Sequence, residues 1–310
     1  MRPTRRSKTG DSLYAIALAG GRVQVAHVIR DAGRRPRVDT LLDAPSEGSS
    51  TETLRRLRKE LRLDRGQVSA LLAPGEYQVH AVDAPDVPEA EMRTAVRWRL
   101  KDVIDYPPEQ ATVDVLSLPQ ASSSHGRLPQ VLAVSARSER ISGVIELFDA
   151  ARLDLAVIDI HETAQRNVAS LYEEGERAVA LVSFTETGGL FTVSARGQLY
   201  LSRALETGTE LLSGTDADTR SGLIDRMALE LQRSLDHFDR QYGGLQVARL
   251  LIAPFAEVDA LRLALAENLY VPVEILDLAR ALELESSPLL RDPAAQGRHL
   301  RLLGAALRDF

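Results

Sequence analysis

Two stretches of the chain share one pattern of apolar strands and glycine turns. The first covers residues 13–42 and the second residues 178–205, and each begins with an apolar run. Such runs are typical of central strands that are covered on both faces. A glycine pair follows each run, Gly20-Gly21 in the first stretch and Gly188-Gly189 in the second. Because paired glycines supply the positive φ angles of a two-residue turn, each stretch is predicted to open with an antiparallel hairpin, followed by a third strand.

Helical periodicity marks the segments that follow these strands. The longest predicted helix runs from about 221 to 242, where apolar residues recur at steps of three and four and Gly243-Gly244 ends the pattern. Another helix is expected over 89–104, and Pro107-Pro108 prevents its continuation. Its predicted buried stripe consists of Met92, Val96, Leu100 and Val103.

The order of the elements predicts two lobes with an insertion in the first. A strand at 77–82 is expected to close the first lobe, and a differently organised block begins at Pro85 and Pro88. A final helix near 299–307 completes the second lobe. The predicted organisation is a flexible basic N-terminus (1–12), a first lobe (13–85), an inserted α/β subdomain (86–153), a return to the first lobe (154–175) and a second lobe (176–310).

The repeated strand pattern indicates a duplicated α/β architecture. This duplication is typical of the actin-like, ribonuclease H-like fold, in which two halves enclose ATP and two hairpin turns hold its phosphates. Those turns carry an Asp that manages the metal ion. The corresponding segments here are residues 16–21 and 182–187, and neither contains an Asp. The predicted fold class is therefore α/β, actin-like and duplicated, without the acidic residues of the nucleotide site.

Composition narrows the function classes. The 310 residues are 44% hydrophobic and 26% charged, which is ordinary for a globular chain with room for two cores. The absence of cysteine excludes disulfides, thiolate metal ligands and cysteine nucleophiles. The net charge of -6 argues against nucleic-acid binding, and no apolar stretch approaches the roughly 20 residues that span a bilayer. These features predict a cytoplasmic protein.

A basic cluster begins the chain. Arg2, Arg5, Arg6 and Lys8 precede the first acidic residue, Asp11. We favour a disordered, solvated tail as its interpretation, and contact with anionic lipid at a membrane surface is the alternative.

The sequence contains no recognisable catalytic or metal-binding motif. His161-Glu162 begins like the H-E-x-x-H zinc helix, but Gln165 occupies the place of the second histidine. The other histidines are scattered singly, and no G-x-S-x-G nucleophile elbow is present. We therefore expect neither enzyme activity nor a bound metal.

Several segments carry a resemblance to a known family. Residues 91–107 (EMRTAVRWRLKDVIDYP) resemble the helix and aromatic-proline turn of PilM, the cytoplasmic actin-like protein of type IV pilus machines. Residues 134–159 resemble its V-A-A-R strand, helix and returning strand, and residues 230–242 resemble its E-I-R-R-S-L-D helix. Residues 158–167 (IDIHETAQRN) are closer still to the corresponding segment of MshI, the counterpart in mannose-sensitive haemagglutinin (MSHA) pilus systems. The resemblance to this MshI/PilM family covers essentially the whole chain in order.

The chain departs from PilM at all three nucleotide-binding motifs. The first PilM turn, D-I-G-S-S-S, falls on residues 17–22, the second, D-I-G-A-S-T, on residues 183–188, and the adenosine motif, S-G-G-G, on residues 252–255. The degenerate nucleotide site consists of Ala17, Ala19, Gly20, Gly21, Ser183, Thr185 and Pro254. Replacing Asp with alanine removes a magnesium-facing carboxylate, and Pro254 removes a backbone N–H. The resemblance therefore implies that ATP binding is lost and that no cofactor is used.

Trp98, the only tryptophan, is the candidate partner-binding residue. On the 89–104 helix it lies on the far side from the predicted buried stripe, flanked by Arg97 and Lys101. Tryptophan and arginine are favoured at interface hot spots, yet a large aromatic is more often part of a core. Two interpretations stay open. Trp98 either packs against the first lobe or lines, with its basic neighbours, a groove that receives a partner.

The resemblance implies a non-catalytic scaffold held at the inner membrane through its partner. A groove between the first lobe and the insert, lined by the 89–105 helix, would bind the N-terminal peptide of a PilN-like single-pass inner-membrane protein. The scaffold would link the membrane platform to the pilus motor ATPases, and it could form a homo-oligomer. A GspL-like cytoplasmic component of type II secretion is one alternative, although that family continues into a transmembrane helix. An active actin-like ATPase is the other, which the missing acidic residues oppose.

Overall fold

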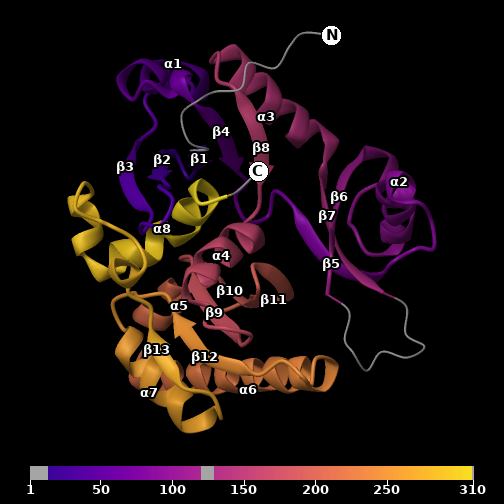
Figure 1. Ribbon diagram of the computed structural model, residues 1–310, viewed down its shortest axis with the longest axis vertical. Helices are drawn as coiled ribbons and strands as arrows, with labels where there is room; N and C mark the ends of the chain where they lie inside the picture. The colour runs from indigo at the N-terminus through magenta and orange to yellow at the C-terminus, as the bar shows by residue number, and fades with distance from the viewer. Residues whose placement is uncertain (1–12, 120–128, 309–310) are drawn as a thin grey trace.

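Two five-stranded sheets, one in each half of the chain, organise the structure (Figure 1). The computed structural model describes residues 13–119 and 129–308, so the basic cluster at residues 2–8 lies outside the described residues. The first sheet has the strand order β3-β2-β1-β4-β8 and the second β11-β10-β9-β12-β13. In both sheets three antiparallel strands are followed by two strands parallel to the first. The predicted duplication is confirmed.

The elements have the following bounds. The first sheet contains β1 (Leu13–Ala19), β2 (Arg22–Ile29), β3 (Arg37–Pro45), β4 (Gln67–Leu71) and β8 (Leu155–Asp159). The second contains β9 (Ala178–Phe184), β10 (Gly189–Ala195), β11 (Gln198–Leu205), β12 (Val247–Ile252) and β13 (Val273–Ile275). The insert contains β5 (Gln78–Asp83), β6 (Ala111–Ser117) and β7 (Gln130–Arg137). The helices are α1 (Ser50–Glu60), α2 (Glu89–Arg99), α3 (Ser138–Ala150), α4 (His161–Ala169), α5 (Thr209–Gly214), α6 (Ala217–Gln241), α7 (Val258–Asn268) and α8 (Pro293–Ala306).

The first hairpin has the predicted two-residue turn, and the second does not. Gly20 and Gly21 connect β1 to β2 with φ values of 56° and 70°. In the second hairpin Phe184 pairs with Gly189, so the loop runs from residue 185 to residue 188, and Gly188 and Gly189 lack positive φ angles. Glycine at 189 instead provides space, because a Cβ there would lie 3.0 Å from the ring of Phe184.

The insert is a three-stranded antiparallel sheet with the order β5-β7-β6. β5, the strand that the sequence places in the first lobe, pairs with β7 along its whole length. Conversely, α3 packs through Val144 and Phe148 into the core of the first lobe. The insert therefore extends from β5 to β7, which corrects the boundaries expected at residues 86 and 153. Alternation along one strand cannot identify its sheet, because the pairing partner is distant in sequence.

The helix α2 ends before its apolar pattern does. It stops at Arg99 and continues as a short 3₁₀ turn. A 3₁₀ turn has three residues per turn, so the face that each following residue presents is shifted. Val103 consequently points outward and is 49% exposed, whereas Ile104 and Tyr106 enter the core of the insert. The predicted burial of Val103 is wrong.

Two helices each pack against the sheet that they do not follow in the sequence. α4 follows the last strand of the first sheet but packs against the second, and α8 follows the second sheet but packs against β1 and β2. Apolar residues of both helices and of the inner faces of both sheets form one shared core, near the centre of Figure 1. α8 also begins earlier than the predicted residue 299, because Asp292 caps its N-terminus and Pro293 occupies its first position. The final helix thus belongs to the first lobe as much as to the second.

Further helices cover the outer faces of the sheets. α1 and α3 pack on the outer face of the first sheet, and α6 and α7 pack on that of the second. Each sheet is therefore covered on both faces, as the apolar central strands predict. Within residues 13–119 and 129–308, no helix combines the length and the apolar character needed to cross a membrane.

The crossing of α4 and α8 predicts a strong effect of Gly304→Ala. A Cβ at Gly304 would lie 2.0 Å from the backbone carbonyl oxygen of Ala164, and the backbone of neither helix can easily move away. We expect the free energy of unfolding, measured by urea denaturation, to fall by about 2 kcal/mol or more, as in other overpacked cores.

The matched control is Gly222→Ala in α6. Nothing lies within 4 Å of a Cβ at this exposed position, so helix propensity should raise the stability by about 0.5–1 kcal/mol. Equal stabilities of the Gly304→Ala and unmodified chains would contradict a tight crossing.

Candidate functional site

The first predicted phosphate turn, at the end of β1, offers no side-chain ligand. Ala17 is half-buried against the core shared by α4 and α8, and Ala19, Gly20 and Gly21 are exposed. None of these residues has a side-chain donor or acceptor. The turn therefore presents only its main chain.

A carboxylate beside this turn is already paired. Arg22 donates from Nε to Oδ1 of Asp43 over 2.7 Å, and Gln24 donates to Oδ2 over 3.0 Å. Nε2 of the buried His299, from α8, lies 3.6 Å from the same carboxylate. Burial disfavours the ionised form, but the hydrogen bonds from Gln24 and Arg22 lower the pKa of Asp43. Asp43 therefore stays ionised and anchors Arg22. Sequence analysis missed this pair, because the two residues lie on different strands.

At the second turn, Ser183 has a structural role. Its side chain is fully buried and donates to Oε1 of Gln165, a fully buried residue of α4. The amide group of Gln165 in turn donates to the carbonyl oxygens of Leu181 and Leu190 over 2.9 and 3.1 Å. Gln165, which excluded a zinc motif in the sequence, thus connects α4 to the second sheet through hydrogen bonds.

Thr185 and Pro254 are also structural. Oγ1 of Thr185 accepts a hydrogen bond of 3.1 Å from a backbone N–H of its own loop. The carbonyl oxygen of Pro254 lies so close to α8 that a Cβ on Gly297 would approach it to 1.9 Å. The rings of Phe184 and Phe255 meet edge to face with centroids 5.3 Å apart.

The structure brings two of the three predicted turns together. β9 and β12 are neighbours, and the N–H of Ala253 donates to the carbonyl of Val182 over 2.8 Å. The turns that follow these strands are therefore adjacent. The first turn belongs to the other sheet, and it lies near the same end of α8, because His299 is close to Asp43 beside this turn and Gly297 faces Pro254.

A buried polar cluster lies where α4 begins. Tyr77 donates to Oε2 of Glu162 over 2.8 Å, and its hydroxyl accepts from the N–H of His161 over 3.1 Å. Arg301 of α8 donates to Nδ1 of His161 over 2.7 Å. Burial, together with the positive charge of Arg301, lowers the pKa of His161 to about 3, and burial raises the pKa of Glu162. Sequence reasoning missed this cluster. Its one signal is an arginine within the apolar pattern of α8.

The cluster is not a metal site. No group of three or more His, Cys, Asp or Glu that could hold a metal ion occurs in the described part of the chain. The nearby Asp159, at the end of β8, is 2% exposed and forms an ion pair of 3.0 Å with Arg308.

Trp98 lies on the outer surface of α2 and is 49% exposed. Cζ of Arg97 lies 5.9 Å from the centroid of its ring, within cation–π distance, and Lys101 is exposed nearby on the chain. The interpretation that Trp98 packs against the first lobe is therefore wrong. Partner binding by Trp98, Arg97 and Lys101 stays a prediction.

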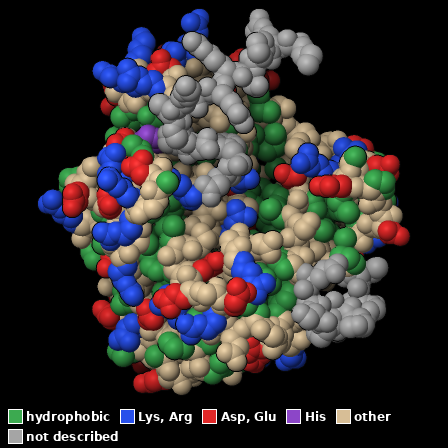
Figure 2. All heavy atoms as spheres, in the orientation of Figure 1, with side chains coloured by type: hydrophobic (Ala, Val, Ile, Leu, Met, Phe, Trp, Pro, Cys, Tyr) green, Lys and Arg blue, Asp and Glu red, His purple; other side chains and the backbone are tan. Residues whose placement is uncertain are grey.

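The helix α2 does not line the groove that the sequence analysis expects. It covers one face of the insert sheet, where Val96 packs with Val131 and Ala133. The opposite face of that sheet joins α3 in the core of the first lobe. The half-buried residues of this junction are Val79, Leu116, Val134 and Ile141. Ile145, one helical turn after Ile141, is 51% exposed. We call the surface formed by these five residues the α3 crevice, and Figure 2 shows hydrophobic side chains between the first lobe and the insert.

Comparison with known protein families decides the family of this chain. The profile of a family described as type IV pilus assembly protein PilM matches residues 48–218, which is more than half of the chain. The chain belongs to this family. No curated protein matches it.

Solved structures place the PilM-family chain in the actin-like fold. A structure described as a PilM–PilN type IV pilus biogenesis complex is 20% identical, with a TM-score of 0.71, and the match covers 96% of this chain and 98% of that one. A Bacteroides thetaiotaomicron protein with an actin-like ATPase fold and unknown function is 12% identical, with a TM-score of 0.52 and coverage of 92% and 97%. The cytoplasmic domain of EpsL, an inner-membrane component of the type II secretion system of Vibrio cholerae, is 16% identical, with a TM-score of 0.50 and coverage of 96% of both chains. The predicted fold class is confirmed.

The half-buried His161 predicts a loss of stability in acid. Its pKa is about 3 in the folded protein, below the usual 6.5, so the unfolded chain binds the proton first as the pH falls. The stability that neutral His161 contributes is present above about pH 6.5 and is lost toward about pH 3, by about 1 kcal/mol per pH unit. We expect His161→Gln to flatten the dependence of the unfolding free energy on pH, measured by urea denaturation across this window.

Glu162→Gln provides the opposite control. Because the pKa of Glu162 is raised, its protonation in the folded state adds stability as the pH falls, so removing it should steepen the loss in acid. An NMR titration in which the His161 ring protonates near pH 6.5 would contradict the burial argument.

Proposed function

We propose that this PilM-family chain is a non-catalytic cytoplasmic scaffold of a type IV pilus assembly machine. Its partner is the N-terminal peptide of a PilN-like inner-membrane protein, and this peptide holds the chain at the inner membrane. The scaffold links the membrane platform to the motor ATPases. The likeness to a PilM–PilN complex over 96% of the chain supports this assignment, together with the hydrophobic α3 crevice.

The α3 crevice is the proposed peptide site. It presents half-buried aliphatic side chains from the three strands of the insert sheet and from α3, and Ile145 adds an exposed one at its border. An extended peptide suits such a surface, because its alternate side chains can enter apolar pockets while its main chain pairs with a sheet edge. β5 and β6 are both edge strands of the insert sheet.

Trp98, Arg97 and Lys101 form a second proposed contact surface. Arg97 and Trp98 lie on α2 and Lys101 on the 3₁₀ turn that follows it, on the other face of the insert sheet from the crevice, and nearly half of Trp98 is open to solvent. An exposed tryptophan beside an arginine has the composition of an interface hot spot. A peptide in the α3 crevice would have to pass around the edge of the sheet to reach it.

We further propose that the pilus is of the MSHA type. Residues 158–167 carry this assignment through their similarity to MshI. A GspL-like role in type II secretion is the alternative, and the shared fold with the cytoplasmic domain of EpsL favours it over an enzyme.

Loss of the nucleotide site is also part of the proposal. The predicted site residues at the three turns either lack polar side chains or use them within the fold, and Asp43 is held by Arg22. We expect isothermal titration with Mg-ATP to show no binding and a phosphate-release assay to show no hydrolysis, because Ala17 and Ser183 stand where the metal-facing Asp residues of the two phosphate turns would be. Saturable micromolar binding would favour the ATPase alternative instead.

A peptide titration tests the scaffold. A synthetic peptide that copies the cytoplasmic N-terminus of the PilN-like protein should bind the purified chain, and Ile145→Asp should weaken binding by about 2 kcal/mol, because it places a charge in an apolar site. Because Ile145 is half exposed, the melting temperature should change little.

Trp98→Ala is the matched variant on α2. A similar loss of affinity, without a change in melting temperature, would show that the peptide reaches the α2 surface, and a loss with Trp98→Ala alone would move the site from the crevice to α2. If the unmodified chain binds no such peptide, the scaffold proposal is wrong.

A further inference from the structure

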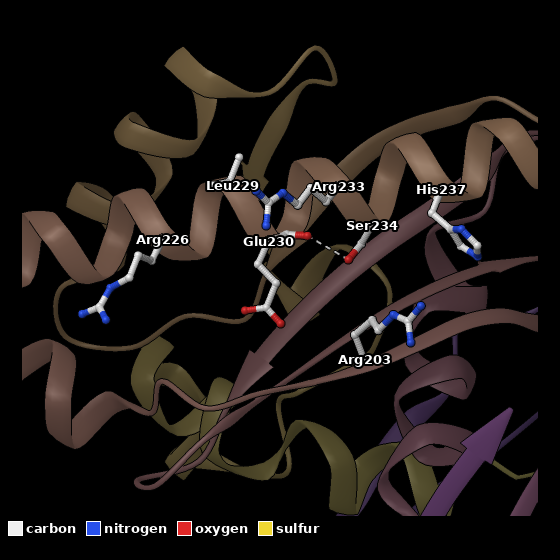
Figure 3. Close-up of a pocket in the computed structure, with 7 residues that line it drawn as sticks. All are labelled: Arg203, Arg226, Leu229, Glu230, Arg233, Ser234 and His237. Carbon is white, nitrogen blue, oxygen red and sulfur yellow. Dashed lines mark hydrogen bonds between the residues drawn. The ribbon is translucent and has the colours of Figure 1, made fainter.

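A hollow of about 520 Å³ lies in the second lobe, between α6 and β11 (Figure 3). It belongs to the second sheet, whereas the strands of the insert form a sheet of their own. The residues that line it are Arg203, Arg226, Leu229, Glu230, Arg233, Ser234 and His237. The resemblance to the E-I-R-R-S-L-D helix falls on this stretch of α6, yet neither the nucleotide turns nor the α3 crevice uses it.

The geometry of both elements directs side chains into the hollow. Arg226, Glu230 and Ser234 recur every four residues, so they form one stripe along α6. On β11, Arg203 pairs with Phe191, a residue of the core beneath α6, and therefore points to the α6 side of the sheet. Figure 3 shows Glu230 and His237 on the side of α6 that faces the strand carrying Arg203.

The hollow has an excess of positive charge. Arg203, Arg226 and Arg233 are exposed, and none of them forms an ion pair with a described residue. Glu230 is the one acidic residue of the lining, and burial together with the charge of Glu206 raises its pKa. Other arginines of the second lobe are paired, such as Arg249, whose guanidinium lies 2.7 Å from Glu174. Arginines that form no ion pair with a described residue, around a hollow in a chain of net charge -6, point to an anionic partner.

The strand beside the hollow has a free edge. β11 is the outermost strand of the second sheet, and no described strand pairs with its outer side. Such an edge presents unpaired N–H and C=O groups to an incoming strand. Leu229, which is 46% exposed, adds an apolar contact at the border.

The charges are spread along the helix. From Arg226 to His237 the helix rises about 16 Å, which is the length of about five residues of an extended strand. A single phosphate is too small to contact cations over this distance, whereas a strand presents a side chain to the same face every second residue.

We propose that this hollow binds an extended acidic segment of a protein partner. The segment adds as a strand to the edge of β11, and its carboxylates, at every second position, pair with Arg203, Arg226 and Arg233. Leu229 contacts an apolar side chain of the same segment. This site is independent of the proposed PilN-like peptide and of the α3 crevice, so the scaffold holds two partners on different lobes.

The test uses the full chain and a fluorescein-labelled peptide of eight alternating Glu and Val residues, titrated by fluorescence anisotropy at low salt. We expect binding that weakens as salt is added, because the contacts are ionic. Arg203→Glu and Arg233→Glu should each lower the affinity by about tenfold or more, whereas Glu230→Gln should raise it by about threefold, because it removes a like charge. Misfolding cannot produce that gain. Arg291→Glu, an exposed arginine outside the hollow, is the matched control and should leave the affinity unchanged.

Three further measurements separate the alternatives. Hydrogen exchange should slow at the amides of β11 when the peptide binds, and absence of this protection would overturn strand addition. A peptide with four Glu followed by four Val should bind more weakly; equal affinity would overturn the alternating pattern. Displacement by millimolar inorganic phosphate would assign the hollow to small anions. If the peptide does not bind, or if neither Arg203→Glu nor Arg233→Glu weakens its binding, the proposed site is wrong.

Discussion

The close crossing of α4 and α8 is the contact on which the other features of the structure depend. Gly304 lets the two backbones approach until no side-chain atom fits between them, and Nδ2 of Asn167 donates to the carbonyl of Gly304 over 2.9 Å. Because each helix packs on the sheet that the other helix follows in sequence, this one contact joins both lobes into a shared core. It also brings Arg301 against His161, so the polar cluster exists only while the crossing is intact.

The same crossing holds several residues of the predicted nucleotide turns of this PilM-family chain in place. Gln165 of α4 reaches Ser183, and Gly297 of α8 lies against Pro254, so two of the three turns are tied to the crossing helices. A buried polar group without a partner costs about 1–3 kcal/mol, which these hydrogen bonds avoid. Once the side chains are fixed in this way, a ligand would have to break hydrogen bonds of the fold to reach them. These turn residues are therefore a stable part of the core.

Local signals in the sequence predicted local structure well. The glycine pair gave the first hairpin, and the apolar runs gave both central strands, because backbone conformation and burial on two faces follow from a few neighbouring residues. The wrong predictions concern features that depend on contacts between residues far apart in the sequence. β5 joined the sheet of the insert, Val103 turned outward after a 3₁₀ turn, and Gly189 proved to be needed for space beside Phe184. The pair of Arg22 with Asp43 and the hollow beside Arg203 depend on strand register, which one sequence does not specify.

A fixed core and separate binding surfaces together fit a scaffold better than a switch. In an enzyme of this fold, a nucleotide between the lobes can change their relation, because it contacts both of them. Here α4 and α8 already contact both sheets through backbone packing and buried hydrogen bonds, so the lobes are joined without a ligand. The proposed surfaces, the α3 crevice on the first lobe and the basic hollow beside β11, lie on opposite sides of that junction. A partner bound at one lobe is then held at a constant position relative to a partner at the other, which is the mechanical requirement for linking a membrane protein to a motor.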